Sequence, residues 1–261
     1  MESSVMKSLI QALRLLTLLP IPGRQFGASG SLESGGTAAA YPLAGLVIGI
    51  LSAAAAWCAG MILGVWGIAV MATVARIIIT GGMHLDGLAD LADGWGGGRD
   101  RDKRLAIMAD SRLGSFGALA LMVVLCLQTV FIFEWINSAI LSQNSEVMTF
   151  LPVVLIPALS RGMIPLLMKG FPAARPGGMG KQARSSVTFI GAGMALLFGV
   201  LPVSACFFPS GLILSVSVFM IMSVAGLGIS KSLGGLTGDC YGALIEIGDT
   251  AGFLGVLIFL R

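Results

Sequence analysis

Long apolar stretches constrain this chain more than any other feature of its sequence. Seven stretches are each long enough to cross a bilayer as a helix, which takes roughly 17 to 25 mostly apolar residues. The composition agrees, because the mean hydropathy is +0.94 and only 11% of the residues are charged. We therefore expect an all-α polytopic membrane protein, with 1–261 as a single integral membrane domain and 40–260 as its transmembrane bundle. The expected spans lie near residues 40–62, 64–81, 115–135, 150–168, 187–207, 211–230 and 243–260.

The distribution of Lys and Arg predicts how the chain is oriented in the membrane. The connections around 62–65, 136–149 and 208–210 contain neither residue. The other connections are basic, and an excess of Lys and Arg is typical of cytoplasmic connections. We therefore expect a multi-pass protein of the cell inner membrane with its N-terminus in the cytoplasm. The basic residues assigned to this side are Lys7, Arg14, Arg24, Arg99, Arg101, Lys103, Arg104, Arg112, Lys169, Arg175, Lys181, Arg184 and Lys231.

The first 22 residues predict a helix that lies along the membrane surface. Over residues 5–19, apolar and polar side chains fall on opposite sides of a helix. Pro20 and Pro22 then end it. A signal peptide is the alternative, but Arg14 interrupts the apolar region and no clear cleavage site follows. We therefore expect an interfacial amphipathic helix within residues 1–22.

The net charge argues against one class of partner. The formal charge is only +3, and the membrane topology already accounts for the basic residues. We therefore expect no nucleic-acid partner. The sequence leaves the oligomeric state open, including a homo-oligomer.

An unusual acidic run, GGMHLDGLADLADG, occupies residues 81–94. On a helix, Asp86, Asp90 and Asp93 fall at i, i+4 and i+7, so one face carries three carboxylates. Such anions repel one another unless a cation lies between them. Carboxylate oxygens suit Mg²⁺, which in turn attracts phosphate. We therefore expect these three residues to bind magnesium at a site of phosphate chemistry.

A second acidic group lies at the start of the last span. Asp239 and Glu246 are seven residues apart and share a helical face, whereas Asp249 is rotated away from it. Under the expected topology both acidic groups face the cytoplasm. Asp239 and Glu246 are candidates for a catalytic base or a metal ligand. The alternative is an ion pair with an arginine inside the membrane.

Basic residues near these groups are candidate contacts for phosphate or substrate. Arg112 follows Asp110 and precedes a glycine-rich entry to the third expected span, and guanidinium binds phosphate oxygens through two hydrogen bonds. Arg161 lies inside a span, where an ion pair with a carboxylate is the alternative. The full set of candidates is Arg112, Arg161, Lys181 and Arg184.

His84 is the only histidine in the chain and lies two residues before Asp86. Its imidazole titrates near neutrality, so it is a third candidate for a general base. The alternative is a side chain that packs at the end of a helix. The sequence does not decide among His84, Asp239 and Glu246.

Three motifs resemble the cobalamin synthase family, whose members are adenosylcobinamide-GDP ribazoletransferases. They are the acidic run at 81–94, MADSRLG at 108–114, and LTGDCYGA at 236–243 with Glu246. The resemblance covers essentially the whole chain. It implies a Mg²⁺-dependent membrane enzyme. Under the expected topology, its active site would lie on the cytoplasmic side.

The resemblance also implies a reaction. The hydroxyl of α-ribazole, or of its 5′-phosphate, would attack the phosphorus that joins GDP to adenosylcobinamide, and GMP would leave. The product would be adenosylcobalamin or its 5′-phosphate, in the last step of the cobalamin nucleotide loop.

Two other functions compete with this interpretation. DLADG at 90–94 is similar to the start of the CDP-alcohol phosphotransferase motif, but Gly97 and Gly98 stand where that motif continues with Ala-Arg. An ion-coupled transporter would also place charges within spans. However, transporters typically carry internal repeats, and none is apparent here.

Overall fold

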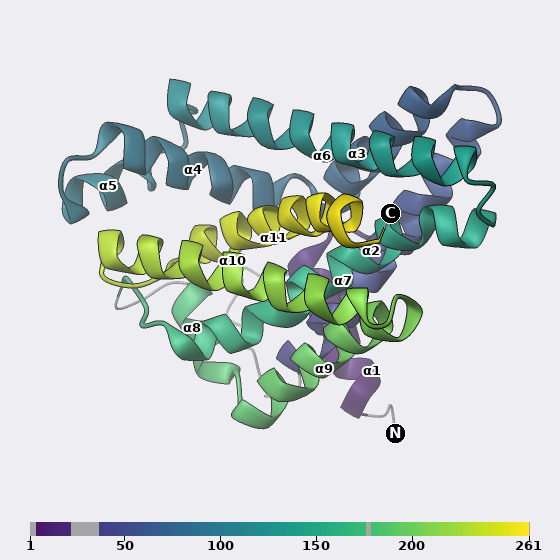
Figure 1. Cartoon of the computed structure of the whole chain (residues 1–261). Coiled ribbons are helices and arrows are strands. Elements are labelled where there is room, and N and C mark those ends of the chain that lie inside the picture. Colours follow the sequence, from purple (N-terminus) through teal and green to yellow (C-terminus); the bar gives the residue numbers. More distant parts are fainter. Residues whose placement is uncertain (1–3, 22–36, 176–178, 261) are drawn as a thin grey trace.

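The computed structural model describes residues 4–21, 37–175 and 179–260, and nearly all regular structure in these ranges is helical (Figure 1). Within them, strand pairing is limited to one isolated bridge between Ala173 and Leu236. The predicted all-α fold is confirmed. The elements are α1 (Ser4–Leu16), η1 (Ala38–Ala40), α2 (Tyr41–Gly60), α3 (Val65–Thr80), α4 (Met83–Gly97), α5 (Arg101–Ile107), α6 (Ser115–Leu141), α7 (Glu146–Gly170), α8 (Met179–Ser186), α9 (Phe189–Cys206), α10 (Ser210–Leu233) and α11 (Gly238–Phe259).

Six segments are long and apolar enough to cross a membrane alone, and they contain α2, α6, α7, α9, α10 and α11. A seventh candidate consists of α3 and α4 together. The prediction of about seven transmembrane helices is therefore confirmed. The seven expected spans overlap α2, α3, α6, α7, α9, α10 and α11 in that order.

The helices differ from the predicted arrangement at residues 81–82, where the chain turns sharply between α3 and α4. We call this turn the corner. Gly81 and Gly82 have φ angles of 63° and 69°, a left-handed conformation that glycine adopts readily. α4 therefore turns by 90° from α3. The acidic run was expected at the end of the second span, but the structure places it on a separate helix. Leu18 contacts this corner, because its N–H donates to the carbonyl of Ile79 at 2.8 Å and its side chain lies beside Gly81.

α7 is the most buried of the candidate spans, and it packs closely against α2. Two glycines of α2 allow this approach. A Cβ atom on Gly45 would lie 2.2 Å from the carbonyl oxygen of Pro157, and one on Gly49 would lie 2.2 Å from that of Val154. Any side chain here would push the two helices apart.

α4 packs against both α6 and α11 (Figure 1). A Cβ atom on Gly87 would lie 2.6 Å from the backbone oxygen of Asp239, and one on Gly242 would lie 3.1 Å from the Cα atom of His84. These two glycines bring the backbones of α4 and α11 into contact. The acidic run therefore lies beside the start of α11.

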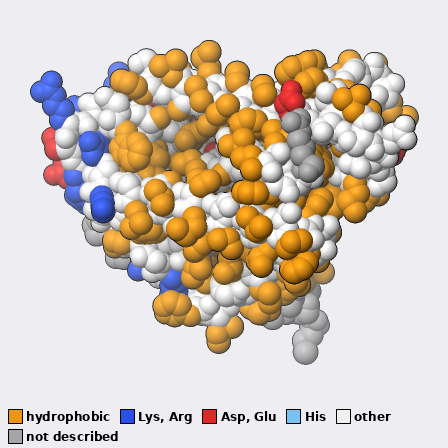
Figure 2. All heavy atoms as spheres, viewed as in Figure 1, with side chains coloured by type: hydrophobic (Ala, Val, Ile, Leu, Met, Phe, Trp, Pro, Cys, Tyr) orange, Lys and Arg blue, Asp and Glu red, His pale blue; other side chains and the backbone are white. Residues whose placement is uncertain are grey.

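The surface separates apolar from charged regions. Figure 2 shows hydrophobic side chains over much of one face, and most of the visible Lys and Arg side chains toward the end where α4 and α5 lie, with acidic side chains among them. α6 is mostly exposed along this face, as expected for a helix in contact with lipid. The arrangement agrees with a bundle whose charged end projects from the membrane.

The N-terminal helix ends at Leu16, earlier than the predicted limit and before Pro20. Ser8 and Ala12 are buried, and the helix contacts α2 and η1. Its position along a membrane surface stays a prediction. Of the expected 1–22 segment, residues 1–3 and 22 lie outside the described part of the chain.

We expect Gly49→Ala to destabilise the protein, because its methyl group must displace the α7 backbone at Val154. Overpacking of this kind costs about 1–3 kcal/mol. Gly193→Ala is the matched control, since a Cβ atom there meets nothing within 4 Å. Thermal unfolding of both variants in detergent tests this. An equal midpoint for the two would show that the α2–α7 contact is not tightly packed.

Candidate active site

Asp86, Asp90 and Asp239 form an acidic surface where α4 meets the start of α11. Asp86 is exposed, and the other two are half-buried. The three lie close enough to influence one another electrostatically, because Asp90 senses both Asp86 and Asp239. Thr237 begins α11 and donates its hydroxyl to Asp239 at 3.2 Å. The structure thus brings carboxylates of two helices together at an accessible place.

Asp93 shares the helix with this acidic surface but has its own backbone partners. Its two carboxylate oxygens accept the N–H groups of Gly114 and Gly117, each at 2.8 Å. The side chain is buried and lies at the N-terminal end of α6, where unpaired N–H groups and the helix dipole favour an anion. Asp93 therefore anchors the start of α6 to α4.

The acidic surface was also expected to bind magnesium. Across residues 4–21, 37–175 and 179–260, no three His, Cys, Asp or Glu side chains are arranged as a ready metal site. Magnesium, however, keeps several waters and commonly takes only one or two protein carboxylates together with substrate phosphates. An exposed Asp86 beside a half-buried Asp90 offers oxygen donors of that kind.

Arg112 lies in the exposed connection between α5 and α6. Its guanidinium pairs with Asp110 through Nη2 at 2.5 Å and Nε at 3.0 and 3.1 Å. These hydrogen bonds lower the pKa of the Asp110 carboxyl to about 2. The pair borders an open pocket of about 450 Å³ that also includes Asp93 and Phe116. Arg112 is thus accessible from solvent, as a phosphate contact must be.

Arg161 is completely buried and does not face the acidic surface. Its Nη1 pairs with Asp249 at 3.2 Å, and both side chains have zero exposure. Ser160 donates to the same carboxylate. Its other terminal nitrogen, Nη2, lies 3.4 Å from Nδ1 of His84. The alternative role for Arg161, an ion pair within the bundle, is the one seen.

His84 is buried in the first turn of α4. A guanidinium can only donate hydrogen bonds, so Nδ1 of His84 accepts from Arg161 and the ring proton belongs on Nε2. Nε2 is itself buried without a partner among the described atoms. In this arrangement, His84 offers no accessible lone pair.

Glu246 is buried deeper in the bundle, one turn before Asp249 on α11. It accepts a hydrogen bond from Nε2 of Gln128 at 3.0 Å, and the amide oxygen of Gln128 accepts from Arg76. A second buried polar group therefore joins α3, α6 and α11. Glu246 was predicted to share a role with Asp239, but the structure separates the two side chains in depth.

The remaining predicted contacts lie near the charged end. Nε of Arg184 donates to the carbonyls of Met168 and Phe171, each at 2.9 Å, at the end of α7. Lys181 belongs to α8, but its side chain lies outside the described residues. Neither observation assigns these two residues to a substrate.

Two residues near the site were missed in the sequence. Arg175 acts electrostatically on Asp239 and donates to the carbonyl of Leu105 at 2.7 Å. Gln128 links the buried acid Glu246 to Arg76. A polar amide within an apolar span was a usable signal for Gln128. No sequence signal pointed to Arg175, because its position depends on how the loop before α8 folds.

Fold and site together define a polytopic membrane protein with an accessible cluster of carboxylates at its charged end. Comparison with known proteins gives its family. The profile of the cobalamin-5-phosphate synthase family matches residues 8–257, and the chain belongs to this family.

Relatives in several bacteria carry the name adenosylcobinamide-GDP ribazoletransferase. The chain is 39% identical to that of Roseiflexus sp. over 92% of this chain and 85% of the relative. It is 35% identical to that of Pseudomonas aeruginosa, over 94% and 96% of the two chains. For Klebsiella pneumoniae the values are 32% identity over 97% and 100%. No solved structure matches the chain.

We expect Asp93→Ala to lower stability, because two N–H groups at the start of α6 lose their acceptor. Loss of a helix cap costs about 1–2 kcal/mol. Asp86→Ala on the same helix is the control and should leave the thermal midpoint unchanged, since Asp86 is exposed. Equal stability of the two variants would show that Asp93 does not anchor α6.

Proposed function

We propose that this protein is a ribazoletransferase that joins α-ribazole, or its 5′-phosphate, to adenosylcobinamide-GDP. The ribazole hydroxyl forms a new bond to the phosphorus attached to cobinamide. The bond between that phosphorus and the bridging oxygen breaks, and GMP leaves with the oxygen. The product is adenosylcobalamin or its 5′-phosphate. The family match over residues 8–257 is the observation that carries this proposal.

The same match weighs against the two competing functions. It spans both acidic groups and all seven candidate spans, whereas the likeness to CDP-alcohol phosphotransferases is confined to 90–94. The relatives named above also cover nearly the full chain under one enzyme name. A transporter or a CDP-alcohol enzyme therefore has no comparable support.

Asp86 and Asp90 are the proposed magnesium ligands. Bound magnesium would neutralise negative charge on the pyrophosphate while the phosphorus is attacked. Asp86 is exposed and Asp90 is half-buried beside it, so phosphates could approach both. Asp93 has backbone partners for both oxygens, which supports a structural role rather than the predicted role as a ligand.

Asp239 is the proposed base for the ribazole hydroxyl. It lies at the acidic surface and is half-buried, so a hydroxyl bound there could donate a proton to it. His84 instead accepts from Arg161, and Glu246 is buried against Gln128. These contacts favour Asp239 among the three candidates.

Basic residues at the same end would bind the phosphates and GMP. Arg112 is exposed in the connection before α6, and Arg175 acts electrostatically on Asp239. Lys181 and Arg184 stay candidates predicted from the sequence. Arg161 does not, because its ion pair with Asp249 leaves it buried.

The charge distribution supports a place for this site on the cytoplasmic side of the inner membrane. The connections near α4, α5 and α8 contain most of the Lys and Arg, and those at the opposite ends of the spans contain none. The lipid bilayer is thus a partner of the protein, and a homo-oligomer is a further possible assembly.

The reaction can be tested with purified protein in liposomes, given adenosylcobinamide-GDP, α-ribazole and Mg²⁺. We expect GMP release, and we expect Asp86→Asn and Asp90→Asn to reduce it at least ~100-fold, because charge stabilisation of this kind typically contributes that much. Asp102→Asn, an exposed change on α5, is the control. Without GMP release from the parent protein, the proposed reaction fails. Full activity in both variants would overturn only the assignment of the magnesium ligands.

The base assignment has its own test in the same assay. Asp239→Asn should lower kcat by roughly 100-fold or more, the usual contribution of a general base. His84→Asn keeps an acceptor for Arg161, and Glu246→Gln keeps one for Gln128, so both should retain kcat within about tenfold. Thermal midpoints confirm that each variant is folded. A folded but inactive His84→Asn variant would assign the base to His84 instead.

A further inference from the structure

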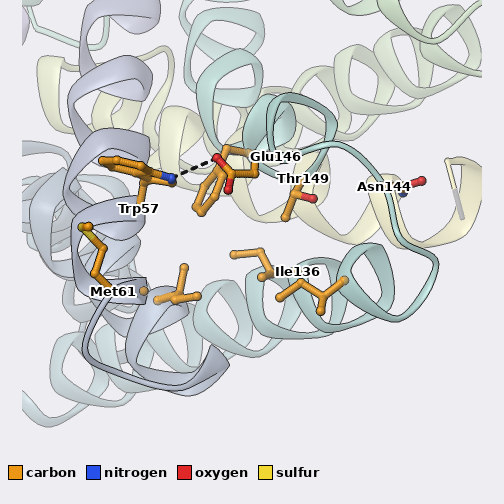
Figure 3. A pocket seen from close by; sticks show the side chains of 10 residues that line it. Trp57, Met61, Ile136, Asn144, Glu146 and Thr149 are labelled. Carbon is orange, nitrogen blue, oxygen red and sulfur yellow. Dashed lines mark hydrogen bonds between the residues drawn. The ribbon is translucent and has the colours of Figure 1, made fainter.

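A pocket of about 450 Å³, distinct from the acidic surface, is lined by Trp57, Ile136 and Glu146, among other residues (Figure 3). It is formed where α2 and α6 end and where α3 and α7 begin. Ile136 lines it, whereas Gly117 of the same helix contacts Asp93. At 1.5 Å per residue, these two positions on α6 are about 29 Å apart. The pocket therefore belongs to a different region from the proposed reaction.

The walls of this pocket are apolar and reach the lipid-facing surface. Ile68, Ile136 and Phe150 line its inner part, while the exposed Met61 and Ile140 lie toward the outside. A channel of this kind suits a hydrocarbon chain that enters from the bilayer. The polar groups of the lining belong to Trp57, Asn144, Glu146 and Thr149.

Those polar groups include a carboxylate at the rim. Glu146 is the first residue of α7, and its Oε2 accepts a hydrogen bond from Nε1 of Trp57 at 3.2 Å (Figure 3). The connections 61–64 and 142–145 beside it contain no Lys or Arg. Among the described residues, none of the ion pairs involves Glu146. The pocket thus combines apolar walls with one negative charge that has no cation beside it.

This combination favours some lipid head groups over others, through their charge and their hydrogen-bond donors. An anionic head group would be repelled by Glu146 and would meet no nearby cation. A quaternary ammonium carries no N–H, so it cannot donate a hydrogen bond to the carboxylate. A primary ammonium offers three donors, and a hydrogen bond between two charged groups is about twice as strong as a neutral one.

We propose that this pocket binds a phospholipid with a primary ammonium head group, phosphatidylethanolamine, through Glu146, with an acyl chain between α2, α6 and α7. Trp57 orients the carboxylate through its indole N–H. The bound lipid fills the gap between the α2–α7 pair and α6 and stabilises their ends. The proposal is independent of the reaction assigned to the acidic surface.

The test compares three lipids with identical acyl chains: phosphatidylethanolamine, phosphatidylcholine and phosphatidylglycerol. Each is added to delipidated protein in detergent, and native mass spectrometry and the thermal midpoint are recorded. We expect phosphatidylethanolamine to bind roughly tenfold more than the other two, as one charge-assisted hydrogen bond would give, and to raise the midpoint. Equal binding of the three lipids would overturn the proposal.

Two variants and one control make the test specific to the pocket. Glu146→Gln should abolish the preference for the primary ammonium, since the side chain keeps its size and loses its charge. Ile140→Trp, at a half-exposed wall position, should reduce lipid binding by filling the pocket. Glu134→Gln removes a carboxylate of α6 that does not line the pocket and should change nothing. A preference that survives in Glu146→Gln would refute the assignment.

Discussion

The buried ion pair between Arg161 and Asp249 holds together the part of the bundle on which the site depends. It links α7 to α11, and Arg161 also reaches His84 in the first turn of α4. Removal of one partner from such a pair leaves an uncompensated charge and typically costs about 3–5 kcal/mol. The positions of α4 and α11 relative to α7 are therefore fixed from inside the protein.

The other end of α4 is fixed by different means. Asp93 binds the start of α6, and Arg101 and Arg104 of α5 bind the end of α10 through Leu233 and Ser232. The segment with Asp86 and Asp90 thus lies between two anchored points. A site that binds charged phosphates needs its carboxylates held against their mutual repulsion, and these contacts supply that constraint.

Apolar length located the six single candidate spans and the first half of the bent α3–α4 pair, since a bilayer requires a similar length from each helix. Helical spacing placed Asp86, Asp90 and Asp93 on one face, but spacing reports only the direction of a side chain. It could not predict that the N–H groups of Gly114 and Gly117 would bind Asp93, because that depends on how α6 approaches α4. Two consecutive glycines at 81–82 are compatible with a sharp turn, but the sequence alone does not predict the 90° angle between α3 and α4. An ion pair between Arg161 and a carboxylate was one of the predicted alternatives, because a charged side chain inside a bundle needs a partner of opposite charge.

The contact between Leu18 and the corner at Gly81 couples the N-terminal segment to the site. Leu18 binds the α3 backbone at Ile79 and fills the space where any other residue at 81 would place its Cβ atom. The corner also sets the direction in which α4 presents its carboxylates. The segment that follows α1 therefore takes part in fixing the corner from which α4 begins, in addition to the contacts of α1 with α2 and η1.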